Sequence, residues 1–203
     1  MDSERQISNI ENKKSEPKIK EGADFVFKQN LELAKIGSKE QYSEYLDFIF
    51  PESKIRINNE SVIMYHNSEN KFDISLYDKD RNMYWTSSRE GHFESNENTI
   101  CAILNVNNPK YVDAYEITNK ISKESTKEYK DKDGLIAENE VYIERIKESN
   151  KNLEDYKQDL LFPEVLIFNP DQIHILGSKQ DLENFKKFIE DKNKNQDEKY
   201  LVK

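Results

Sequence analysis

The sequence is poor in the residues from which disulfides, metal sites and phosphate-binding loops are built. Its 203 residues include one cysteine, three histidines and five glycines, each of which stands singly. The lone Cys101 has no partner for a disulfide within the chain and lies in an apolar run, so we expect a buried, unreactive thiol. The histidines lack the spacing of metal ligands, and the sequence has no glycine-rich loop. We therefore expect no metal site, no P-loop and no Rossmann-type nucleotide site.

Long hydrophobic runs are missing as well. No stretch approaches the roughly 18 apolar residues that span a bilayer, and residues 1–22 lack the apolar core of a secretory signal. Hydrophobic and charged residues each make up 35% of the chain, and the net charge is −9. An acidic surface repels phosphate backbones, which argues against broad electrostatic binding of nucleic acid. The sequence therefore predicts a cytoplasmic protein that makes no contact with a membrane.

What is present fits one domain with polar ends. A chain of 203 residues is of the size of a single domain. Residues 1–22 are polar and we expect them to be disordered, residues 23–191 form the domain, and residues 192–203 form a polar tail. Within the domain, residues 131–162 are highly charged and read as a helical insertion.

The first part of the domain has the spacing of a helical hairpin. Apolar residues recur at helical intervals over residues 24–35, and Gly37 then fits the position after a helix where a positive φ is common. Ser38 followed by Gln41 forms a capping box that begins the second helix, which Pro51 ends.

The rest of the domain alternates short strands with helices. A helix is expected over residues 111–130, and a closing helix begins after Ser178, with Asp181 in its first turn, and gives way to the tail after Asp191. β-Branched and aromatic runs predict strands at residues 61–65, 83–86, 100–106, 164–168 and 172–176. The fold class is α+β: a core of short, mostly antiparallel strands with an N-terminal helical hairpin and a C-terminal helix.

Three stretches together resemble the ADP-ribosyltransferase-like domains of phage and mobile-element polyvalent proteins. They are FKQNLELAKIGSKEQYSEYLDFIFPESK followed by VIMYHNS, then ILNVNNPKYVD, and last VLIFNPDQIHILGSKQDLENFKKFI. They stand in the family's order and cover most of residues 25–190. The resemblance implies an ADP-ribosyltransferase-like core and NAD as the substrate.

The wider group, which includes the poly-ADP-ribose polymerases and diphtheria-type toxins, places a His, a Tyr and a Glu on three strands. The resemblance assigns these catalytic positions to His66 in YHN, Tyr84 in MYWTS and Glu164 in PEVLIF. Gln172, eight residues after Glu164, matches the family's glutamine and supports that assignment.

Transfer of ADP-ribose breaks the bond between nicotinamide and ribose through a transition state that resembles an oxocarbenium ion. A fixed carboxylate, here Glu164, stabilises the positive charge that grows on the ribose. We expect His66 to donate to a ribose hydroxyl and Tyr84 to stack on nicotinamide. The remaining cofactor-binding candidates are Asn67 through its backbone, Thr86 and Ser87 through their hydroxyls, and Phe93 as a second ring.

Two positions depart from the family. Asn67 stands where the family has glycine, and Phe93 is the only ring available where the family has a second tyrosine. Each catalytic candidate also has a structural interpretation, as a strand-edge acid, a core histidine or a core aromatic residue. Tyr84 and Trp85 point to opposite sides of a strand, so only one of them can line a pocket.

Three functions follow from these observations. The first is a phage or mobile-element mono-ADP-ribosyltransferase that modifies a host protein or nucleic acid in the bacterial host cell. The second is a catalytically degenerate binding protein of the same fold, for example an inhibitor of a host defence system. The third is a small nuclease toxin, which the scarcity of histidine and the acidic charge disfavour.

Overall fold

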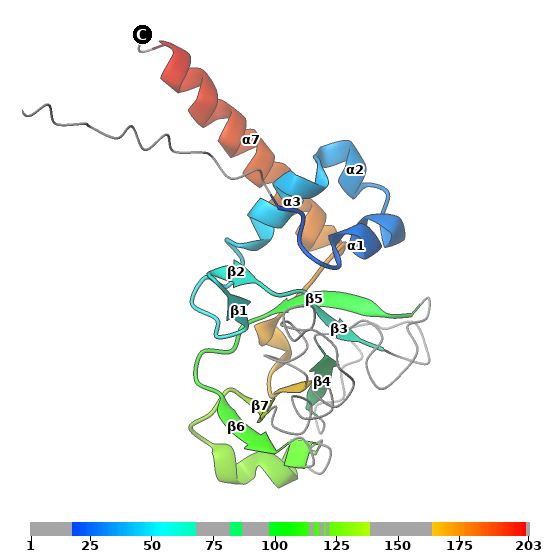
Figure 1. Ribbon diagram of the computed structural model, residues 1–203, viewed down its shortest axis with the longest axis vertical. Helices are drawn as coiled ribbons and strands as arrows, with labels where there is room; N and C mark the ends of the chain where they lie inside the picture. The colour runs from blue at the N-terminus through cyan, green and yellow to red at the C-terminus, as the bar shows by residue number, and fades with distance from the viewer. Residues whose placement is uncertain are drawn as a thin grey trace, which may run out of the picture.

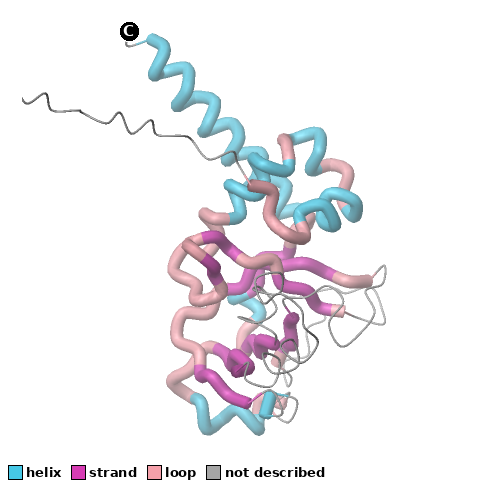
Figure 2. Tube along the Cα trace, viewed as in Figure 1, coloured by secondary structure: helices cyan, strands magenta, loops and turns pink. Residues whose placement is uncertain are grey.

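A computed structural model describes residues 18–67, 82–86, 98–113, 116–117, 120, 122–138 and 164–201. The helices α1, α2, α3 and α7 gather at one end of the molecule, and the strands lie below them (Figure 1). The same division into helices and strands is visible along the Cα trace in Figure 2. This arrangement confirms the α+β class. Residues 1–17 of the segment expected to be disordered and residues 139–162 of the predicted helical insertion lie outside the described residues. Lys20 is bonded to Ser43 and Asp47, so the expected disorder does not extend to it. Residues Gly134–Glu138 form a strand, so a helix is wrong for that part of the insertion.

The N-terminal segment forms three short helices instead of the predicted hairpin of two. These are α1 (Ala23–Gln29), α2 (Leu33–Ile36) and α3 (Lys39–Leu46). The first predicted helix is interrupted because Asn30 has an extended backbone and its Nδ2 donates to the carbonyl of Gly177 at 2.6 Å. The capping box of Ser38 and Gln41 is confirmed at the start of α3.

Gly37 is needed for space and not for a positive φ. Its φ is −168°, which is extended backbone, so the predicted left-handed conformation is wrong. A Cβ on Gly37 would lie 2.8 Å from Cζ of Phe185 and 2.9 Å from Oε1 of Gln41. The glycine therefore lets helix α7 approach the turn between α2 and α3 closely.

Seven strands form one mixed sheet in the order β6-β7-β8-β4-β3-β5-β9. Among its described pairs only β6 and β7 are parallel, and the others are antiparallel. The strands are β3 (Met64–His66), β4 (Met83–Thr86), β5 (Ile100–Leu104), β6 (Lys110–Asp113), β7 (Gly134–Glu138), β8 (Glu164–Ile167) and β9 (Ile173–Ile175). A separate hairpin joins β1 (Arg56–Ile57) to β2 (Glu60–Ser61).

Two further predicted elements differ from the structure. The helix expected over residues 111–130 is replaced at its start by strand β6, and a 3-10 helix, η2, covers Glu124–Tyr129. Strand β6 forms because β7 offers it a partner, and its Val112 packs into an apolar cluster. The closing helix α7 (Lys179–Leu201) also runs well beyond Asp191. Many residues of its polar second half, such as Lys, Gln and Glu, have a favourable helix propensity. The predicted polar tail over residues 192–203 did not take this propensity into account.

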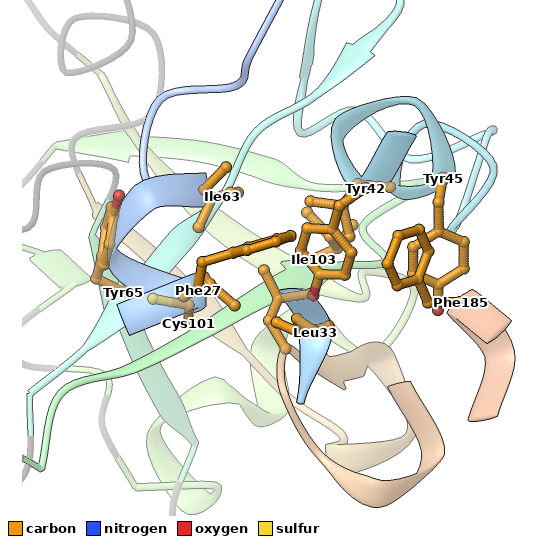
Figure 3. Packing of buried hydrophobic residues seen from close by; sticks show 13 residues of the cluster. Phe27, Leu33, Tyr42, Tyr45, Ile63, Tyr65, Cys101, Ile103 and Phe185 are labelled. Atoms are coloured by element: carbon orange, nitrogen blue, oxygen red, sulfur yellow. The ribbon is translucent and has the colours of Figure 1, made fainter. Parts of the chain in front are cut away.

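One face of the sheet carries the helices. We call it the helix face; Ile63, Tyr65, Cys101 and Ile103 point from it towards α1, α3 and α7. In Figure 3 the side chains of Phe27, Tyr42, Tyr45 and Phe185 gather against these sheet residues. Cys101 is buried, as expected. A second cluster lies on the same face over β6, β7 and β8, and a third covers the opposite face.

A buried aspartate fastens the helices to the sheet. Asp181, which is 0% exposed, accepts hydrogen bonds from the Tyr42 hydroxyl at 2.5 Å, the Tyr45 hydroxyl at 3.1 Å, His174 Nε2 at 2.8 Å and the Gly177 amide at 2.7 Å. Burial, and then the adjacent carboxylate, raise the pKa of both tyrosines, which keeps them protonated as donors. This clamp joins α3, β9 and the first turn of α7, and it gives His174 a structural role.

Candidate functional site

The three strands that carry the catalytic candidates are neighbours in the sheet. Strand β4 lies between β3 and β8, although β8 follows β4 by more than seventy residues in the chain. Thr86 on β4 is the partner of Tyr65 on β3 and of Glu164 on β8. Tyr84 is paired with Leu166 on β8. The chain thus brings three distant segments to one place on a rigid sheet.

Four of the predicted site residues share the helix face. Alternate residues of a strand point to the same side, so Tyr84, Thr86 and Glu164 lie together with Tyr65. Asn67, two residues after Tyr65, points to this side too. Its Oδ1 accepts a hydrogen bond from Thr99 Oγ1 at 2.7 Å. We call the set Asn67, Tyr84, Thr86, Thr99 and Glu164 the polar strip.

The polar strip interrupts the apolar surface of the helix face. On the side of β3 and β5 it meets the cluster under the N-terminal helices, which includes Tyr65 and Cys101. On the side of β7 and β8 it meets the second cluster, which contains Leu135 and Leu166 and against which Tyr84 packs. Polar groups placed between two apolar clusters are typical of sites that orient a ligand.

Three residues of the polar strip are deeply buried, and Asn67 and Tyr84 are half-buried. Glu164 is 2% exposed, Thr86 7% and Thr99 1%. A carboxyl group in such surroundings must form hydrogen bonds to offset its lost hydration.

His66 is adjacent to the polar strip but lies on the opposite face. Its ring packs against Trp85, with 5.5 Å between the ring centroids, and Trp85 belongs to the cluster on that face. Its Nδ1 lies 2.7 Å from the carbonyl oxygen of Tyr84. The structure therefore brings Asn67, Tyr84, Thr86 and Glu164 together and does not place the His66 imidazole beside them.

The hydrogen bond to Tyr84 fixes the tautomer of His66. A carbonyl oxygen only accepts, so Nδ1 carries the proton, and Nε2 of the neutral ring is an acceptor. Burial lowers the pKa of His66, while the bond to the Tyr84 carbonyl raises it by less. The ring is consequently neutral near pH 7, and its Nε2 can accept a hydrogen bond but cannot donate one, whereas donation to a ribose hydroxyl was expected.

The choice between Tyr84 and Trp85 is settled by the register. Tyr84 is half-buried on the helix face, whereas Trp85 is fully buried in the cluster of the opposite face. Tyr84 is therefore the aromatic residue of the polar strip. The candidates Ser87 and Phe93 lie outside the described residues.

The sequence did not point to Thr99 as a residue of the site, and it offered Gln172 only as a match to the family's glutamine. Thr99 joins the polar strip only through the pairing of β3 with β5, which no local pattern reveals. Gln172 braces the turn after β8, because its Nε2 donates to the carbonyls of Asn105 at 2.7 Å and Asp133 at 2.8 Å. Its Oε1 accepts from the Asn169 amide at 3.0 Å, so all of these contacts are structural.

Comparisons with protein-family models, with curated proteins and with solved structures give no match for this chain. The described residues contain no group of three or more His, Cys, Asp and Glu side chains that could hold a metal ion. Within the same part of the chain no helix is both long and apolar enough to cross a membrane.

Proposed function

We propose that this protein is a phage or mobile-element mono-ADP-ribosyltransferase, which uses NAD to modify a macromolecule of the bacterial host. One observation carries the proposal: Tyr84, Thr86 and Glu164 meet on one face of two adjacent strands. The sequence resemblance assigns catalytic positions to Tyr84 and Glu164, and the Thr86 hydroxyl is a further candidate for holding NAD. The neighbouring position of the β3 strand, which bears His66, supports the proposal further.

Each residue of the site has a defined task in this chemistry. The Tyr84 ring stacks on nicotinamide, and the Thr86 hydroxyl bonds to the ligand beside it. The Glu164 carboxylate stabilises the positive charge that develops on the ribose as the bond to nicotinamide breaks. Strand positions suit these tasks because the backbone there is held on both sides, which fixes the direction of each side chain.

His66 acts as a positioning residue in this proposal. Its imidazole, on the opposite face, donates a hydrogen bond from Nδ1 to the backbone carbonyl of Tyr84. Tyr84 is the residue whose ring stacks on nicotinamide in this proposal. The bond ties the end of β3 to β4 and so restricts motion of the Tyr84 backbone. The mechanism expected from the sequence has the imidazole and the Glu164 carboxylate converge on one cleft, and their places on opposite faces of the sheet are the observation that speaks most strongly against it.

Incubation of the protein with labelled NAD and host lysate tests the proposal. We expect the wild-type protein to label a target, and Glu164→Gln to reduce labelling by at least about 100-fold, because an amide cannot stabilise the oxocarbenium charge. Glu183→Gln, at an exposed position of α7, is the control and should label as wild type does. Labelling that persists in Glu164→Gln contradicts the mechanism.

A catalytically degenerate binding protein, for example an inhibitor of a host defence system, is the second candidate. The position of His66 on the opposite face and the Asn67 side chain on the polar strip favour it. The two functions separate in a calorimetric titration with NAD. Micromolar binding speaks for the transferase, and the absence of heat at millimolar NAD speaks for the binding protein.

A further inference from the structure

We infer that Thr99 is a positioning residue of the proposed NAD site, where it holds the side chain of Asn67 away from the nicotinamide position. The inference rests on the proposed function. Thr99 directly precedes strand β5 and lies outside the three strands that carry the catalytic candidates.

The contacts of Thr99 fix both its side chain and its backbone. His66 is the partner of Ile100, so Asn67 comes opposite Thr99 at the next position of the same register. The Thr99 hydroxyl donates to Asn67 Oδ1 at 2.7 Å. The Thr99 carbonyl accepts from Nε2 of Gln29, the last residue of α1, also at 2.7 Å. Thr99 therefore links Asn67 to the N-terminal helices.

The direction of this hydrogen bond matters because β3 lies between β5 and β4. Thr99 draws the Asn67 carboxamide towards β5. Tyr84 lies on the other side of β3, on β4, and faces the same way as Asn67. A ring that stacks on Tyr84 needs the space beside β4, which an unrestrained Asn67 side chain can enter.

The backbone at residue 67 does not require glycine. Among the described residues, positive φ angles at non-glycine positions occur only at Phe50, Asn58 and Asn59. Asn67→Gly therefore removes a side chain without relieving a left-handed conformation. If Thr99 affects NAD affinity only by positioning the Asn67 side chain, replacing Thr99 in the Asn67→Gly variant must leave that affinity unchanged.

Calorimetric titration with NAD of five proteins tests the inference: wild type, Thr99→Val, Thr99→Ser, Asn67→Gly and the double variant Thr99→Val with Asn67→Gly. Valine keeps the shape of threonine and removes the hydroxyl, so we expect Thr99→Val to weaken NAD binding about fivefold. Serine keeps the hydroxyl and should retain wild-type affinity. In the Asn67→Gly background, Thr99→Val should cause no further loss.

Thermal melting of each variant identifies any that fail to fold, and Thr99→Ala, which also removes the hydroxyl, carries the comparison if valine is not tolerated. Equal weakening by Thr99→Val in both backgrounds overturns the inference, because Thr99 then acts without Asn67. Unchanged affinity in the single Thr99→Val variant overturns it as well. If wild type binds NAD and this coupling is missing, the inference alone fails; if wild type does not bind NAD, the proposed function fails with it.

Discussion

At the scale of single residues, two opposing effects set the pKa of the His66 imidazole. Burial disfavours the charged ring, and the hydrogen bond to the Tyr84 carbonyl favours it, with burial the larger effect. The net result is a pKa below the ordinary value of 6.5. The unfolded chain therefore binds a proton at residue 66 at pH values where the folded protein does not, and this links the stability of the fold to pH.

We expect acidification to destabilise wild type more than His66→Asn. The contribution of the neutral imidazole is present above the unfolded pKa of 6.5 and is lost as the pH falls from there through the folded pKa. Urea unfolding at several values between about pH 7 and about pH 5 measures the effect. The asparagine amide can still donate to the Tyr84 carbonyl, and all other titrating groups are common to both proteins. Parallel pH profiles would show that residue 66 does not titrate differently in the two states.

The sequence predicts which residues form the candidate site but not the face of the sheet to which each of them points. Strand alternation correctly separated Tyr84 from Trp85, because both belong to one strand. The face of His66 depends on how β3 is aligned with β4, and a shift of one residue reverses every side chain of a strand. Nothing in the local sequence of YHN fixes that alignment.

At the scale of elements, the Asp181 clamp connects parts that are far apart in the sequence. Its carboxylate is fully buried and accepts from two tyrosines, one histidine and one backbone amide. Four donors directed at two oxygens satisfy the group completely, which is what makes its burial tolerable. Helix α3 is thus held to β9 and α7 by polar contacts in addition to apolar packing.

Replacement of Asp181 by asparagine should lower the free energy of unfolding by about 2–4 kcal/mol. The amide nitrogen must face donors on at least one side, either Tyr42 and Gly177 or Tyr45 and His174. Tyr45→Phe, which removes one hydroxyl from the clamp, should cost about 1 kcal/mol. Asp191→Asn, at an exposed position of α7, is the control. Urea unfolding that shows equal midpoints for Asp181→Asn and Asp191→Asn would contradict the assigned role.

Elements whose signal is local were predicted well, and those that depend on partners were not. The capping box of Ser38 and the turn between β8 and β9 carry their own side-chain hydrogen bonds. Strands β6 and β7 are short and stabilise each other by parallel pairing, so neither is distinctive alone. The interruption between α1 and α2 depends on a contact of Asn30 with Gly177, near the other end of the chain.

At the scale of the whole molecule, an α+β class follows from the sum of the elements, but the strand order does not. The central position of β4 results from its pairing with β3 and β8, which are separated in the sequence by about a hundred residues. The composition gives no indication of how the core is divided. Its division into three apolar clusters reflects the sheet, which has an apolar surface on both sides.

A ligand that binds only the folded molecule should raise its stability as a whole. If the polar strip holds NAD, we expect NAD at about 100 times its dissociation constant to add about 2.7 kcal/mol to the free energy of unfolding. Thermal melting with increasing NAD measures this, and adenosine monophosphate, which lacks nicotinamide and its ribose, should give a smaller shift. An unchanged melting temperature at saturating NAD would favour the non-catalytic binding protein.

The contacts of the cluster under the helices also determine when the chain can fold during synthesis. That cluster joins residues 23–65 to Cys101 and Ile103 and to Leu176 and Phe185. The N-terminal helices consequently leave the ribosome before the residues that bury their apolar sides have been made. Their packing is complete only after residues 176–185 have been translated. During this interval the aromatic rings of α1 and α3 are accessible to chaperones. Slow translation of the intervening segment would therefore lengthen the period in which the nascent chain is prone to aggregate.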